Sequence, residues 1–150
     1  MTLRGIPLMV LALIIYNALV WSTSTPPQDL LYGTWVQDAA SNSVVLKGLG
    51  TSIPLPSGIV NLHLGDLLLA FGLVCMAFEM VKATYTRGFG LTDRLLSPLL
   101  FVLFLVEFLL VPKAATSVFF LLTVMAGFDV VVGEVVAIRA ARRDITFGGN

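Results

Sequence analysis

Charged residues are scarce in this chain. Only 12% of the 150 residues are Asp, Glu, Lys or Arg, while 57% are hydrophobic and the mean hydropathy is +0.95. A soluble domain usually carries about twice that charged fraction, so the polar residues are too few to cover a globule in water. The formal net charge is zero, which removes the electrostatic argument for a nucleic-acid partner. The composition therefore predicts a protein whose solvent is the lipid bilayer.

Cysteine and histidine are scarcer still, since Cys75 and His63 are single residues of their types. One cysteine excludes an intramolecular disulfide, and one histidine is too few for a histidine-rich metal or haem site. An intramembrane enzyme would need an activated nucleophile, yet neither Thr123 nor Cys75 has a histidine partner. We therefore expect no cofactor, no metal and no enzymatic activity.

What the chain has in abundance is long apolar runs. They predict an all-α membrane protein, a single domain over residues 1–150 with transmembrane helices at about 6–21, 66–84, 93–111 and 115–139. A span needs about 20 residues for a hydrocarbon core of roughly 30 Å. The first helix is the shortest, and residues 1–24 also resemble a cleaved signal peptide. Tyr16 and Trp21 would suit an aromatic belt at its outer end, which favours a retained helix.

The third predicted helix contains a proline near its start. Either Ser97 caps the helix with Pro98 as its first residue, or Pro98 kinks a helix that begins earlier. The first option leaves about 14 residues, or roughly 21 Å, which is too short to span the bilayer. The second option is therefore favoured.

The basic residues predict the orientation. Seven lie on one side of a four-helix arrangement and two on the other, which is a positive-inside bias. The seven are Arg4, Lys82, Arg87, Arg94, Arg139, Arg142 and Arg143, and the two are Lys47 and Lys113. Both termini are thus expected in the cytoplasm of a bacterial cell, and residues 22–65 are expected to form a periplasmic loop.

This outer loop of about 40 residues shows local patterns of its own. Residues 28–37 gather Leu30, Leu31, Tyr32 and Trp35, which suits a short interfacial helix. Residues 43–49 and 60–64 have β character, with turn residues between them. We predict a small β-hairpin that caps the outer face, followed by an N-cap at Gly65-Asp66 for the second helix.

Four acidic residues interrupt the apolar runs, and an ionisable group in a span prompts a functional hypothesis. Glu79 and Asp129 lie roughly 20 and 21 Å along their helices, at one level of the inner half of the bilayer. Glu134 lies roughly 28 Å along the fourth helix, near the cytoplasmic headgroups. Glu107 lies in the outer half of the third helix, without a basic residue within one turn.

Small residues place two of these acids at helix contacts. Gly72 shares a face with Glu79, and Ala126 and Gly133 share one with Asp129, so both acids are predicted to point at other helices. One interpretation is a buried polar clasp, in which Lys82 pairs with Glu79 and at least one acid is protonated. The other interpretation is a proton-responsive site or an ion path. The sequence favours the clasp.

The remaining candidates lie near the membrane surfaces. Arg139, Arg142 and Arg143 are expected to contact anionic headgroups or a partner, and Trp35 to anchor the outer loop or to bind a partner. Glu107 has three open interpretations, which are a neutral side chain, a bond to a backbone carbonyl and a pair with a cation of another subunit.

Residues 56–82, 106–120 and 141–144 (PSGIVNLHLGDLLLAFGLVCMAFEMVK, VEFLLVPKAATSVFF and ARRD) resemble small four-helix inner-membrane proteins of alphaproteobacteria. The resemblance covers most of the second to fourth helices and little of the first. It implies a multi-pass protein of the bacterial inner membrane, and it implies no function.

The sequence favours an accessory or structural subunit of a larger inner-membrane complex, whether respiratory, photosynthetic or for transport. Its partners would be membrane lipids and other integral membrane subunits. The alternative is a small homo-oligomeric transporter or channel for protons or cations, in which Glu79 and Asp129 would be the coupled groups.

Overall fold

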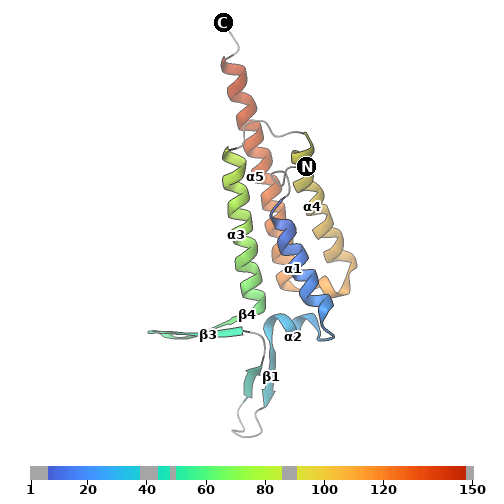
Figure 1. Ribbon diagram of the computed structural model, residues 1–150, viewed down its shortest axis with the longest axis vertical. Helices are drawn as coiled ribbons and strands as arrows, with labels where there is room; N and C mark the ends of the chain where they lie inside the picture. The colour runs from blue at the N-terminus through green and yellow to red at the C-terminus, as the bar shows by residue number, and fades with distance from the viewer. Residues whose placement is uncertain (1–6, 38–43, 48–49, 86–90, 148–150) are drawn as a thin grey trace.

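The computed structural model describes residues 7–37, 44–47, 50–85 and 91–147. Four long helices lie side by side along the long axis of the molecule (Figure 1), namely α1 (Met9–Ser22), α3 (Leu64–Tyr85), α4 (Leu91–Leu110) and α5 (Ser117–Phe147). The predicted helices agree with these bounds to within three residues, except that α5 continues to Phe147. A short 3-10 turn, η2 (Pro112–Ala114), joins α4 to α5.

Among the described residues, two helices are long and apolar enough to cross a membrane. They are α3 over Leu64–Lys82 and α5 over Ser117–Val136, and 28% of each window is buried inside the bundle. The apolar part of α4, Leu95–Leu110, and the whole of α1 are shorter. α4 runs through Pro98, so the option in which Pro98 starts the helix is wrong.

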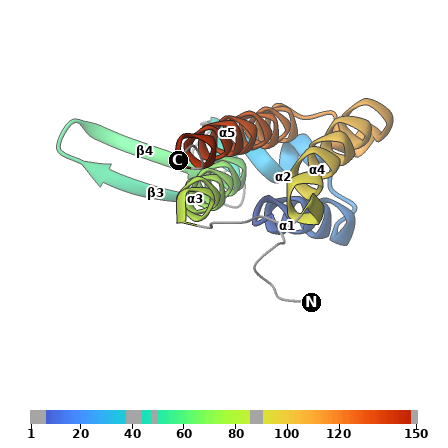
Figure 2. The ribbon, with the colours of Figure 1, turned by 90° about the horizontal axis from the view of Figure 1, so that it is seen from above.

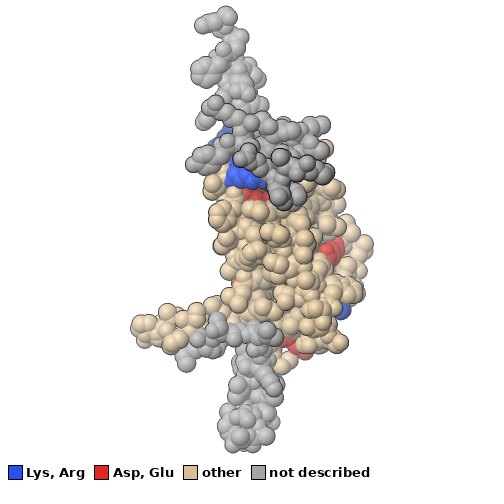
Figure 3. Space-filling model, viewed as in Figure 1, with Lys and Arg blue, Asp and Glu red and all other residues tan. Residues whose placement is uncertain are grey.

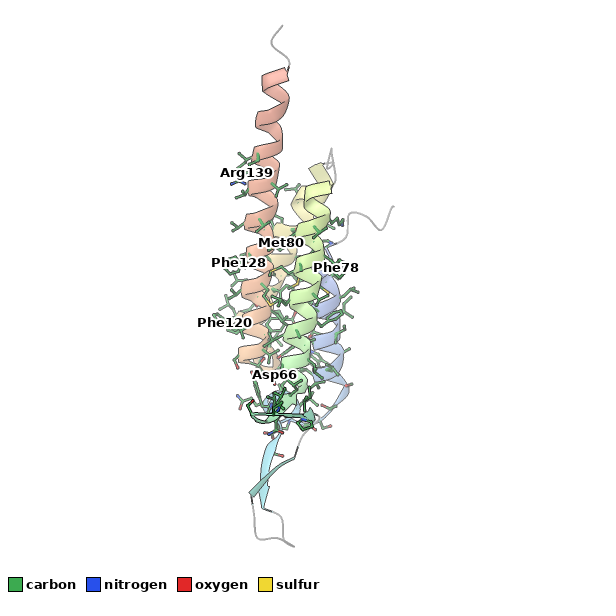
Figure 4. All side chains as sticks on the ribbon, turned by 90° about the vertical axis from the view of Figure 1, so that its left-hand side faces the viewer. Asp66, Phe78, Met80, Phe120, Phe128 and Arg139 are labelled. Atoms are coloured by element: carbon green, nitrogen blue, oxygen red, sulfur yellow. The ribbon has the colours of Figure 1, made fainter. Side chains whose placement is uncertain are left out.

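α5 is the central helix, packed against α3 on one side and α4 on the other (Figure 2). α1 packs against α3 and, less extensively, α5. The fully buried core is aromatic where α1, α4 and α5 meet: the rings of Tyr16 and Phe119 lie 4.7 Å apart, and those of Phe104 and Phe119 lie 5.5 Å apart. Outward-facing residues are large and apolar, as Phe78, Phe120 and Phe128 show in Figure 4.

The segment between α1 and α3 differs from its prediction. It contains the short helix α2 (Pro27–Tyr32) and two separate hairpins, in which β1 (Thr34–Gln37) pairs with β2 (Val44–Lys47) and β3 (Gly50–Leu55) with β4 (Gly58–His63). The predicted pairing of residues 43–49 with 60–64 is wrong. In each hairpin the two strands are consecutive in the sequence, so only a short loop has to be closed, which costs little entropy. The predicted helix over 28–37 ends at Gly33, where φ is 74°.

Neither hairpin forms the predicted cap over the end of the bundle. β1–β2 extends away along the long axis, and β3–β4 projects sideways from the base of α3 (Figure 1). The end of the bundle is instead covered by α2, whose Leu31 is fully buried and whose Leu30 is 7% exposed. α2 therefore packs against the bundle through these two leucines.

Candidate functional site

The N-terminus of α1 is capped by a side chain from another helix. α1 has no side-chain cap of its own and no acidic residue in its first turn. Instead, the backbone N–H of Leu8 donates to Glu79 Oε1 of α3 at 2.7 Å, and the N–H of Met9 also bonds this carboxyl group. Glu79 is only 7% exposed. A carboxylate at this end of a helix satisfies unpaired donors and complements the positive end of the helix dipole.

The other donors of this first turn are also accounted for. Pro7 has no N–H, the N–H of Val10 donates to the carbonyl of Pro7 at 3.2 Å, and that of Leu11 donates to the carbonyl of Leu8 at 2.9 Å. Only Leu8 and Met9 need an acceptor from outside the helix, and Glu79 supplies it. Because buried backbone donors are costly to leave unpaired, α1 depends on α3 for a stable start.

Asp129 of α5 lies close to Glu79 and is 8% exposed. A side-chain hydrogen bond joins it to Ser97 of α4, and the positive charge of Lys82 on α3 attracts both carboxyl groups. We call Glu79, Lys82, Ser97, Asp129 and the first N–H groups of α1 the polar cluster. It brings together all four long helices, as the interpretation of a clasp requires.

One atom of the polar cluster has no partner within the part of the chain that the structure describes. It is Glu79 Oε2, a buried oxygen for which no donor is found there. In a buried site an acceptor of this kind is usually bonded to water or carries a proton. The atom is therefore open to a further hydrogen bond.

The opposite end of α1 is held by a second set of contacts, built around Tyr16. Its hydroxyl lies 2.8 Å from Thr116 Oγ1 and donates to the carbonyl of Lys113 at 3.0 Å. Thr116 Oγ1 also accepts from the N–H of Phe119 at 3.2 Å, which caps the N-terminus of α5. The Thr116 hydroxyl hydrogen then points to Tyr16, so every hydrogen bond of this group has a donor and an acceptor.

Lys113 completes the second set of contacts. Its ammonium donates to the carbonyl of Val20 in the last turn of α1 at 3.5 Å and lies 4.4 Å from the ring centroid of Trp21. A cation is favourable at the C-terminal end of a helix dipole. We call Tyr16, Trp21, Lys113 and Thr116 the tyrosine network. Tyr16 is 1% exposed, so its predicted place in an aromatic belt is wrong, whereas Trp21 is exposed.

The predicted packing residues divide into two groups. Gly72 lies where α3 meets α5, since a Cβ there would be 2.7 Å from Leu122 Cδ2, and Ala126 is 3% exposed. Gly133 is different, because a Cβ there would meet no atom within 4 Å. The predicted packing role of Gly133 is therefore not met among the residues that the structure describes, where that side of α5 faces outward.

The other predicted residues stay outside the polar cluster. Glu134 and Arg139 are exposed, and Glu107 is half-buried on α4, near enough to Tyr16 to act on it electrostatically. Trp35 belongs to β1 and residues 142 and 143 to α5, but the side chains of these three lie outside the described residues. Among the described residues, no group of three or more His, Cys, Asp or Glu could hold a metal ion.

The sequence predicted a cluster of Glu79, Asp129 and Lys82, but it did not predict that the backbone of α1 bonds Glu79. It also missed Ser97, Thr116 and Lys113 as contacts between helices. Thr116 had a readable signal, because a threonine directly before an apolar run is a common N-cap. No family model matches the chain, and neither a curated protein nor a solved structure is significantly similar to it.

Proposed function

We propose that the chain is a four-pass protein of the bacterial inner membrane, with both termini in the cytoplasm, and a non-catalytic accessory subunit of a larger membrane complex. The observation that carries the accessory role is the bond of Glu79 to the start of α1. Glu79, a buried acid that the sequence offered as a transport group, thereby has a structural role in holding α1 against α3. A catalytic or transport group would instead be expected to face a path or a substrate.

The outer surface supports the membrane part of the proposal. The described outward faces of α3, α4 and α5 carry large apolar side chains, and charged groups are sparse on the face shown in Figure 3. Lys82 lies in the last turn of α3 and Arg139 near the same end of the molecule, whereas Lys113 lies in η2 at the other end. This distribution fits the predicted cytoplasmic termini.

The lengths of two helices support a protein neighbour. α1 has 14 residues and Leu95–Leu110 of α4 has 16, or roughly 21 and 24 Å of helix. Both fall short of a hydrocarbon core of roughly 30 Å. Association with other subunits is one way to relieve such a mismatch. Gly133 offers a flat place on α5 where another helix could approach closely.

The proposal is tested by purifying the tagged protein from its native membrane in mild detergent and identifying the co-purifying chains by mass spectrometry. We expect stoichiometric recovery of one set of larger membrane subunits. Gly133→Leu should reduce that recovery without unfolding the chain, because position 133 meets nothing in the bundle. Val124→Leu, at another exposed position of α5, is the matched control. Recovery of this chain alone, as a discrete homo-oligomer, would overturn the accessory role.

The alternative is a homo-oligomeric proton or cation channel, and one observation favours it. Glu79 Oε2 lacks a partner within the described residues and lies in a cluster that also holds Asp129. Proton flux into proteoliposomes of the purified chain tests this function. Glu79→Gln keeps an acceptor for the N–H groups of α1 but cannot carry a proton, so loss of flux in Glu79→Gln or in Asp129→Asn would support the channel. An absence of flux in the wild type would exclude the channel, and flux that survives in both variants would exclude the two acids as its coupled groups.

A further inference from the structure

The hairpin β3–β4 has one apolar and one more polar face. Directly paired residues of an antiparallel hairpin lie on the same face, and the register pairs Ile53 with Val60, Thr51 with Leu62 and Leu55 with Gly58. These pairs form one face, on which the side chains of Ile53, Leu55 and Val60 are 43%, 46% and 42% exposed. The other face carries Pro54, Asn61 and His63, with one aliphatic residue at position 59.

The position of the hairpin is fixed by its junction with α3. β4 ends at His63 and α3 begins at Leu64, with no linker between them. Asp66 in the first turn of α3 accepts from the backbone N–H of His63 at 2.9 Å and lies 3.3 Å from His63 Nδ1. Gly65 is packed too closely against α2 and α5 for any side chain. The hairpin is therefore held rigidly at one end of α3, where Figure 4 shows Asp66.

From this junction the hairpin projects sideways, across the direction of the helices (Figures 1 and 2). Strands of six residues reach roughly 20 Å. With α3 spanning the bilayer as proposed, such a hairpin would run parallel to the bilayer surface at the level where the α3 span ends. The exposed apolar side of α3, which includes Leu67 and Phe71, begins within one to two helical turns of the same point.

Three further features decide which surface the hairpin fits. An isolated two-stranded hairpin is only marginally stable in water, so its apolar face needs a covering surface. Residues 48–62 contain no charged side chain, which removes electrostatic recognition of an oppositely charged protein. Pro54 lies in an edge strand and opposes the addition of a further strand from a partner. An uncharged apolar face at this level fits the outer leaflet of the bilayer.

We propose that β3–β4 is a lateral membrane anchor, whose Ile53, Leu55, Val60 and Leu62 face lies in the interface of the outer leaflet. This inference rests on the proposed membrane span of α3. Together, the α3 span and the hairpin form an L-shaped membrane contact. The hairpin fixes the rotation of α3 about its own axis and its depth, because a rigid arm in the interface resists both movements.

Spin labels on single cysteines test the anchor in lipid nanodiscs, with Cys75→Ala as the background. Leu55→Cys and Val60→Cys report on the apolar face, Asn61→Cys on the other face, and Phe71→Cys on the exposed side of α3. The ratio of accessibility to oxygen over accessibility to a water-soluble nickel chelate should be high at 55, 60 and 71 and low at 61. Because Leu55 lies beside the hairpin turn, far from the bundle, its label leaves the fold intact.

The outcomes separate the anchor from the proposed span. A low ratio at 55 and 60 together with a high ratio at 71 would overturn the anchor and leave the span intact. Protection of 55 and 60 from both reagents would show that protein, such as a second copy of the chain, covers this face, and would also overturn the anchor. A low ratio at 71 would contradict the span itself and the anchor with it.

Discussion

The two ends of α1 are held in chemically different ways. At its N-terminus the partner is a carboxyl group buried among other ionisable side chains, in a cluster to which four helices contribute. Toward its C-terminus, Tyr16 of α1 bonds the neutral hydroxyl of Thr116 and the carbonyl of Lys113, and the Lys113 ammonium lies on the ring of the exposed Trp21. In both places the charge has the sign that the helix dipole requires, although α1 itself contains no charged residue.

The difference shows that access to water changes how much a capping partner contributes to the stability of a helix end. Water can bond the last carbonyls of α1 near the exposed Trp21, so the contribution of Lys113 there is expected to be modest. The first N–H groups of α1 meet a buried carboxyl group instead, where removal of the partner leaves donors unpaired. The ends are therefore predicted to contribute unequally to stability, and four measurements test this comparison.

The largest effect is expected from removal of the Glu79 side chain. Glu79→Ala leaves the N–H groups of Leu8 and Met9 unpaired and should destabilise the protein by about 3 kcal/mol. Glu79→Gln keeps an acceptor oxygen and should cost about 1 kcal/mol. Unfolding by SDS in mixed micelles, followed by tryptophan fluorescence, measures both. Equal losses for the two variants would show that charge, rather than the acceptor oxygen, is what α1 needs.

The next effect concerns the apolar layer between the two ends. Gly72→Ala places a Cβ 2.7 Å from Leu122 Cδ2 and should cost about 2 kcal/mol, because overpacking of about 3 kcal/mol exceeds the helix preference of alanine of about 1 kcal/mol. Gly133→Ala is the matched control, because its Cβ meets nothing and alanine favours a helix by about 1 kcal/mol over glycine. The same unfolding assay should therefore shift in opposite directions for the two glycines. A shift in the same direction would contradict the packing of α3 on α5.

A smaller effect is expected at the tyrosine network. Tyr16→Phe removes the hydrogen bonds to Thr116 and Lys113 and should cost about 1 kcal/mol, while Thr116 keeps its cap on α5. Lys113→Met should cost less than 1 kcal/mol, and added salt should diminish its effect but not that of Tyr16→Phe. If either variant were as damaging as Glu79→Ala, the proposed inequality of the two ends would be wrong.

The smallest effect is expected from Glu134→Gln. This acid is exposed, five residues from Asp129 on α5, and should leave the unfolding midpoint unchanged. The variant thus checks that losing a carboxylate from α5 is harmless when it lies outside the polar cluster. A marked change at Glu134 would mean that the cluster extends beyond the residues named above.

The sequence predicted the helices well because their signal is local. Long apolar runs ended by Pro, Gly and charged residues gave the bounds of the long helices, and the shared depth of Glu79 and Asp129 followed from the rise per residue. Pairings distant in sequence were not predictable in this way. Leu8 and Glu79 are separated by 71 residues, and Tyr16 and Thr116 by 100. Every residue except proline also has a backbone N–H, so the sequence does not indicate which N–H groups bond Glu79.

The strands show a different limit. Their β character was readable, but which strand pairs with which depends on loop closure and on Gly33, whose positive φ ends α2 and starts β1. The direction in which each hairpin leaves the bundle depends on the junction at His63 and Asp66. A cap over the bundle was the simplest assumption, and α2 occupies that place instead.

The caps on α1 also have a consequence in time. The chain is synthesised from its N-terminus, so α1 is complete long before Glu79 and Lys113 have been made. During that interval neither end of α1 has its charged partner, so this apolar helix is not yet fixed against the other helices. Its final docking is then a late event, which requires α3 and the turn between α4 and α5. A chain truncated before residue 79 contains all of α1 but neither of its charged partners, and its α1 should therefore not dock.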